Sequence, residues 1–155
     1  PKYKPNERYL LTYFLGKTPK EYNKKIKRIT KSNNLKVVKL GDIKEKETYR
    51  TGPSEFLSYI KDCSLVCTDS FHGAVFSIIY KKPFIVYKRV GTQSMYSRIN
   101  TLLDKFNLHC RKVECIDYDK NVFDIDYSHI TPILETEREK AIYYLKSALK
   151  IRDEE

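Results

Sequence analysis

The sequence lacks the features of a membrane-embedded or secreted protein. Its 155 residues contain no run of about 18 or more apolar side chains, so we expect no membrane-spanning helix. The first residues do not form a charged and apolar leader, so we expect no secretion signal. The single methionine, Met95, is internal and the chain opens with Pro1, so we expect a piece of a longer protein.

Cysteine is sparse, and its positions do not form a metal-binding pattern. The residues are Cys63, Cys67, Cys110 and Cys115. Their spacings are C-x3-C and C-x4-C with no histidine cluster beside them, so we expect no structural zinc. Cys67 lies in the apolar stretch 64–68 and Cys63 just before it, and both are interpreted as small apolar side chains at a buried strand end. Without a leader we expect a reducing, cytoplasmic location and free thiols.

Positive charge is in excess and concentrated early in the chain. The 30 basic and 20 acidic side chains give +10, and residues 1–62 hold 16 basic against 7 acidic ones. Such a surface suits nucleic acid, an anionic membrane face or an anionic substrate. The aromatic residues fall inside expected strands and helices rather than between exposed arginines, which argues against nucleic acid. We therefore expect no nucleic-acid partner, and leave peripheral contact with the inner face of a membrane open.

Apolar runs alternate with amphipathic segments along the chain. Residues 1–7 hold two prolines and predict a linker, followed by one domain over 8–155. Apolar runs predict strands at 9–15, 35–40, 65–68 and 83–87. Helices are expected after Pro19, Gly52 and Ser70 and at 97–106 and 135–150, with loops at 42–51 and 114–128. This alternation predicts a parallel sheet with helices on both faces, a Rossmann-like α/β domain.

The strongest chemical signal is the segment T-D-S-F-H-G at residues 68–73, between an expected strand and an expected helix. Ligands of such sheets bind beyond the carboxyl ends of the strands, which draws attention to the loops after Leu15, Thr68 and Tyr87. Ser70 can cap the helix, and Gly73 allows a ligand to approach the backbone.

The amides at residues 71–73 would then form an anion site at the positive end of the helix. A bound anion would favour the protonated imidazole of His72, which could donate a proton. The alternative is that these residues only turn the chain. No G-x-S-x-G elbow is present, so Ser70 is not expected to be a nucleophile.

Several segments, in order and spacing, resemble the polysaccharide pyruvyl transferase family. They are G-P-S-E-F-L at 52–57, V-C-T-D-S-F-H-G at 66–73, F-S-I-I-Y-K-K-P-F at 76–84 and S-R-I-N-T-L-L at 97–103. The likeness covers nearly the whole chain but only the C-terminal half of a usual member. It implies a glycosyltransferase-B-like, two-domain protein, with this chain as the C-terminal, donor-side domain and a missing N-terminal domain as its partner.

The resemblance also implies a reaction. Members move a pyruvyl group from phosphoenolpyruvate to two hydroxyls of a sugar, forming a ketal, in the synthesis of bacterial surface polysaccharides and exopolysaccharides. The acceptor would be a sugar or a lipid-linked oligosaccharide, and no cofactor or metal is implied. The donor-site histidine of the family corresponds to His72.

Other residues are expected to bind the substrate around His72. In the segment itself they are Asp69, Ser70, Phe71 and Gly73. Some members carry an arginine ahead of the histidine, where this chain has Ser70 and Phe71, so the cation is expected from elsewhere. Arg98 can bind a carboxylate or phosphate in bidentate fashion, and Arg89 and Lys88 are second choices.

Two alternative functions stay open: a nucleotide-sugar-dependent glycosyltransferase of the same fold, whose diphosphate would suit the same anion site, and a nucleic-acid-binding module. Two D-x-D patterns, at 117–119 and 124–126, imitate a metal signature but are expected to be solvated loop acids. The lone His109 and His129 are expected to be structural.

Overall fold

A computed structural model describes residues 1–90, 96–120 and 122–150 of the chain. The chain divides into two compact units, Pro1–Ile125 and Asp126–Glu155, and each is described by itself. Within the described residues, no helix combines the length and the apolar character needed to cross a bilayer.

The first unit is built on a parallel four-stranded sheet. Its strands are β1 (Tyr9–Tyr13), β2 (Lys36–Leu40), β3 (Leu65–Thr68) and β4 (Phe84–Val86), in the spatial order β2-β1-β3-β4. All pairings are parallel, which confirms the Rossmann-like α/β prediction. The strand order reverses between β1 and β3, and there Tyr13 lies opposite Thr68, which lies opposite Val86. The ends of three strands are therefore level at one edge.

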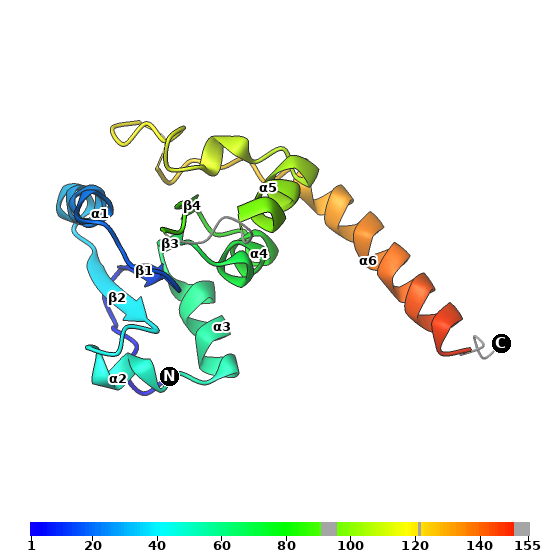
Figure 1. Ribbon diagram of the computed structural model, residues 1–155, viewed down its shortest axis with the longest axis horizontal. Coiled ribbons are helices and arrows are strands. Elements are labelled where there is room, and N and C mark those ends of the chain that lie inside the picture. The colour runs from blue at the N-terminus through cyan, green and yellow to red at the C-terminus, as the bar shows by residue number, and fades with distance from the viewer. Residues whose placement is uncertain (91–95, 121, 151–155) are drawn as a thin grey trace. The chain divides into compact units, whose positions relative to one another are not determined.

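Helices cover both faces of this sheet (Figure 1). The helices of this unit are α1 (Lys20–Asn33), α2 (Lys46–Tyr49), α3 (Pro53–Asp62), α4 (Phe71–Ile79), α5 (Tyr96–Lys105) and a 3-10 turn, η1 (His109–Arg111). Side chains alternate along the strands, so Leu10 and Leu65 join Ile26 of α1 in one cluster on one face. On the other face Tyr9 packs edge-on against Tyr59 of α3, with ring centroids 6.4 Å apart.

The chain departs from the expected elements at three places. The expected loop 42–51 contains α2, which has no buried residue and so leaves no periodic signal. The first strand ends at Tyr13 rather than at residue 15. In the second unit, α6 (Ile130–Ala148) begins five residues before the expected start, so its first turn contains no acidic residue to suit the helix dipole.

The segment after α5 is fastened to the outer strand β4. The N–H of Val113 donates to the carbonyl of Val86 at 2.9 Å, and Lys112 forms a parallel bridge with Val86. The fully buried Arg111 donates to the carbonyls of Phe84 at 2.8 Å and Val122 at 2.7 Å. These bonds cover the edge of the sheet at β4.

Candidate functional site

The loops that follow β1, β3 and β4 meet at one buried carboxylate. The side chain of Asp69 is 3% exposed and accepts from the N–H of Leu15 at 2.7 Å and of Gly16 at 3.0 Å. Arg89 donates to the same carboxylate through Nε at 3.2 Å, and to the Asp69 carbonyl through Nη2 at 3.2 Å. Asp69 and Arg89, both expected to contact substrate, thus bind protein groups, and their pairing holds the three loops together.

Gly16 is needed where this junction is tightest. A Cβ added there would lie 2.6 Å from Cγ of Arg89 and 3.1 Å from Oδ2 of Asp69. Real side chains do not tolerate the first of these distances. A side chain at residue 16 would therefore push Arg89 away from the carboxylate.

A second set of contacts joins the start of α4 to the ends of β1 and β3. The hydroxyl of Thr68 donates to the Tyr13 carbonyl at 2.6 Å and accepts from the N–H of Ser70 at 3.0 Å. Ser70 is buried and caps α4, as expected, by accepting from the N–H of Gly73 at 3.5 Å. A Cβ on Gly73 would lie 2.5 Å from Oγ1 of Thr68, so this glycine lets the helix approach the strand end.

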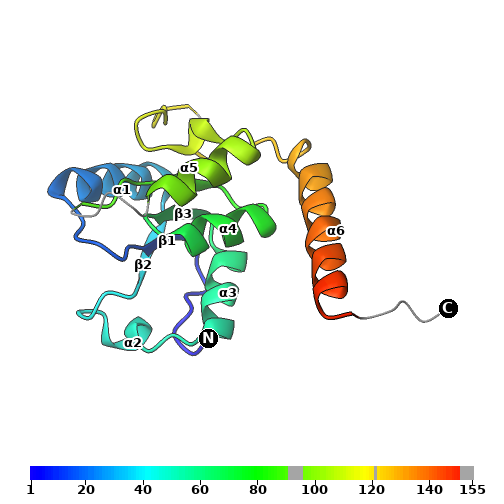
Figure 2. The ribbon, with the colours of Figure 1, turned by 45° about the vertical axis from the view of Figure 1, so that its right-hand side comes forward.

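The side chains of Phe71 and His72 take no part in the hydrogen bonds described above for Thr68, Asp69 and Ser70. His72 is exposed in the first turn of α4, at the carboxyl edge of the sheet, and its ring meets that of Phe71 edge-on at 5.8 Å. The guanidinium of Arg98, on α5, lies 5.3 Å from the centroid of the Phe71 ring. The site therefore brings His72 and Arg98 to the same aromatic ring, from two helices that Figures 1 and 2 show side by side.

The start of α4 also offers backbone donors. In the described part of the chain, no acceptor meets the N–H of Phe71 or of His72, which are the first two amides of the helix. Such amides, together with the positive end of the helix dipole, attract anions. An anion at this end would have the imidazole of His72 beside it.

A pocket of about 320 Å³ adjoins this site on the α5 side. Its lining residues are Phe71, Ser97, Arg98, Thr101, Leu102 and Lys105. The lining contains two cations and no acidic side chain, so it also favours an anion.

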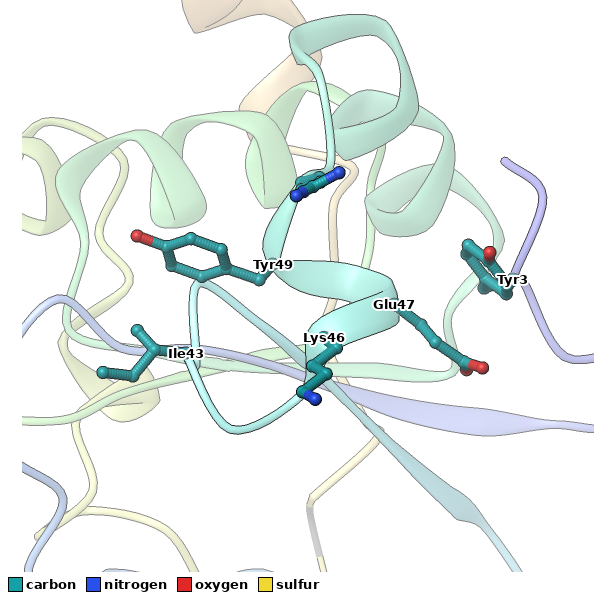
Figure 3. Close-up of a pocket in the computed structure, with 6 residues that line it drawn as sticks. Tyr3, Ile43, Lys46, Glu47 and Tyr49 are labelled. Atoms are coloured by element: carbon teal, nitrogen blue, oxygen red, sulfur yellow. The ribbon is translucent and has the colours of Figure 1, made fainter.

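A larger cavity, of about 670 Å³, lies around α2 (Figure 3). In Figure 3, Tyr49 and Ile43 lie on one side of this helix and Glu47 on the other, toward Tyr3. None of its lining residues belongs to the segment 68–73 or to α5. Because it mixes both signs of charge, it is less suited to an anion than the start of α4.

The remaining candidates lie outside the site or at its margin. Lys88 is exposed at the same edge of the sheet, and its carbonyl accepts from the hydroxyl of Tyr22 at 3.3 Å. The exposed His109 contacts Asp104 of α5, and His129 precedes α6 in the second unit.

Acids of both D-x-D patterns are engaged with nearby protein groups. Asp119 pairs with the exposed Arg28. Asp126 accepts from the N–H and hydroxyl of Ser128, and these bonds lower the pKa of that carboxyl. Within the described ranges, no three His, Cys, Asp or Glu side chains are arranged to hold a metal ion.

Sequence reasoning missed the bonding role of Thr68, the tight contact at Gly16 and the place of Lys105 in the smaller pocket. The apolar-to-polar change at the end of β3 pointed to Thr68. Gly16 carried a weaker signal, as the residue that ends the first apolar run.

Comparison with known proteins agrees with the sequence resemblance over the region of the sheet. The family model for polysaccharide pyruvyl transferase matches residues 1–89. These residues include all four strands, the segment 68–73 and Arg89, whereas Arg98 and the rest of α5 lie beyond the match. The resemblance of residues 97–103 therefore stays a prediction. A search of curated proteins finds no match to the chain.

Proposed function

Because the chain belongs to the polysaccharide pyruvyl transferase family, we propose that it carries the donor site of a transferase that uses phosphoenolpyruvate. The observation that carries the proposal is the exposed His72 in the first turn of α4, beside two unpaired helix amides and near Arg98. Phosphoenolpyruvate carries a phosphate and a carboxylate on neighbouring atoms. The helix end would bind one anionic group, and Arg98 would bind the other in bidentate fashion.

The reaction in this proposal is ketal formation. A proton adds to the methylene carbon of phosphoenolpyruvate, which becomes a methyl group, and a sugar hydroxyl attacks the cationic carbon next to it. The C–O bond to phosphate then breaks, and a second hydroxyl closes the ketal. Of the two hydroxyl protons released, one balances the proton gained by the methyl group and the other leaves with phosphate.

His72 would act either at the first proton transfer or at the departing phosphate. As a protonated imidazole it can donate to carbon or stabilise the leaving oxygen. The rest of the proposal follows the family. An N-terminal domain completes the cleft, the acceptor is a sugar or a lipid-linked oligosaccharide of a bacterial surface polysaccharide, and the chain alone turns nothing over.

Titration of the 155-residue chain with phosphoenolpyruvate, followed by amide NMR, tests the donor site. We expect shifts at the amides of residues 71–73, weakened at least about tenfold by His72→Gln and unchanged by His129→Gln, a matched change in the second unit. Once the chain is joined to its N-terminal partner, His72→Gln should lower turnover by at least about 100-fold. If phosphoenolpyruvate leaves these amides unmoved while UDP-glucose shifts them, the glycosyltransferase alternative replaces the proposal.

A further inference from the structure

The outer face of α1 carries a row of exposed lysines. They are Lys20, Lys24, Lys27 and Lys31, which follow one another at helical intervals of four, three and four residues. Because successive residues of a helix are rotated by about 100°, these intervals keep the four side chains within about 60° of one another around the axis. At about 1.5 Å of rise per residue, the row is about 16 Å long. Together these residues form the lysine row of α1.

The opposite face of α1 holds the helix on the sheet. Ile26 and Ile29 are buried in the cluster that also contains Leu10 of β1 and Leu65 of β3. By the same rotation, the two isoleucines lie on the side of the helix that faces away from the lysine row. The row is therefore presented to solvent in a straight line, on a helix that is packed against the core.

The other cations of α1 have acidic partners, whereas those of the row do not. Lys25 forms an ion pair with Glu21 at 3.1 Å, and the guanidinium of Arg28 pairs with Asp119. Glu21 is the only acidic residue in the helix. Within the described residues, no hydrogen bond or ion pair engages the ammonium groups of the lysine row. Its four positive charges are therefore available to a partner.

The chemistry of the row favours an extended anionic surface as that partner. A lysine ammonium is a point charge on a flexible stem, and it does not bind a single phosphate in the bidentate fashion of arginine. The row contains neither arginine nor an aromatic ring, the groups that recognise individual phosphates and stack on bases. The only aromatic residue of α1, Tyr22, packs against Tyr87 with ring centroids 4.7 Å apart. A bilayer with anionic headgroups attracts such a row by charge alone.

We propose that the lysine row of α1 docks the protein on a membrane surface rich in anionic lipid headgroups. The ammonium groups lie at the headgroup phosphates, while Ile26 and Ile29 stay in the protein core, so α1 rests on the bilayer without entering it. Each lysine near such a surface contributes about fivefold to binding, so four contribute about 600-fold. The proposal goes beyond the donor site and does not depend on it.

Co-sedimentation of the full chain with lipid vesicles tests the docking surface. We expect the chain to bind vesicles of equimolar phosphatidylcholine and phosphatidylglycerol at least about tenfold more tightly than vesicles of phosphatidylcholine alone, with the preference lost near about 1 M salt. The double variant Lys24→Gln, Lys27→Gln should weaken binding to the anionic vesicles at least about tenfold. The matched variant Lys44→Gln, Lys61→Gln removes the same charge from exposed positions outside α1, and should weaken this binding by less than about threefold.

Three results would overturn the proposal. The first is equal affinity for the two kinds of vesicle, or binding to neither. The second is an equal loss in the two double variants, because the attraction would then depend on net charge and not on the row. The third is tighter binding to a random-sequence DNA duplex than to anionic vesicles at the same phosphate concentration, which would assign the row to nucleic acid.

A parallel measurement on His72→Gln separates this proposal from the proposed function. This variant should lose binding of phosphoenolpyruvate and keep the native affinity for anionic vesicles, because His72 lies on α4 and outside the lysine row.

Discussion

Asp69 shows how one buried side chain can hold three loops of the candidate site together. Its oxygens accept from two backbone amides of the β1–α1 loop and from Arg89, and it is almost fully buried. From the sequence, an aspartate after a strand is equally consistent with a ligand contact. The direction of the carboxylate depends on Leu15 and Gly16, more than 50 residues earlier in the chain, and no local pattern records that dependence.

The substitution Asp69→Asn tests whether the Asp69 carboxylate holds the three loops together. The amide keeps the shape but loses the charge opposite Arg89 and replaces one acceptor with a donor. We expect the free energy of unfolding to fall by about 3 kcal/mol, measured by urea denaturation. Asp119→Asn is a matched control, since it also breaks an Asp–Arg pair but an exposed one, and should change stability by less than about 1 kcal/mol. Equal losses of unfolding free energy in the two variants would show that the Asp69 carboxylate contributes no more than an exposed ion pair.

At the scale of elements, sequence reasoning succeeded where burial left a pattern. The strand at 65–68 was predicted with its observed bounds, because all four of its residues are buried and polar residues follow at once. The helix α2 was missed because it buries nothing. Arg111 was missed for the opposite reason: arginine is ordinarily exposed, and only the fold shows its guanidinium beneath the chain between η1 and α6.

Arg111→Met tests whether this cation holds the segment after α5 against β4. Methionine keeps most of the aliphatic volume but takes the guanidinium donor away from the carbonyls of Phe84, Val122 and Asp124. We expect a loss of about 3–5 kcal/mol in urea denaturation, and faster amide exchange at Val113. Arg50→Met, at an exposed position, serves as the control and should be nearly neutral. A small effect at Arg111 would mean that solvent replaces its bonds.

At the scale of the whole molecule, the buried thiols make stability depend on alkaline pH. Burial raises the pKa of Cys63 and of Cys67 to about 12. The unfolded thiols ionise near pH 8.5, so above that pH the unfolded chain releases protons that the folded chain keeps. The contribution of the buried thiols to the free energy of unfolding is therefore fully present below about pH 8.5 and is lost as the pH rises toward 12.

Urea denaturation at pH 8 and pH 10 checks this sign. We expect the free energy of unfolding to fall by about 1–2 kcal/mol for each buried thiol between these values. The double variant Cys63→Ala, Cys67→Ala should lose most of this dependence, whereas Cys110→Ala, at an exposed position, should retain it. A native chain equally stable at both pH values would show that these thiols ionise in the folded state.

The shared carboxylate at the junction of three loops has a consequence for engineering. Replacing the loop between β1 and α1 would move the N–H of Leu15 that donates to the Asp69 carboxylate. Replacing the turn after β4 would remove Arg89, the cation that pairs with this carboxylate. The segments 14–18, 68–73 and 87–90 depend on one another, because the Asp69 carboxylate bonds to groups in the first and the third. A design that changes one of these loops in this chain must therefore change all three together.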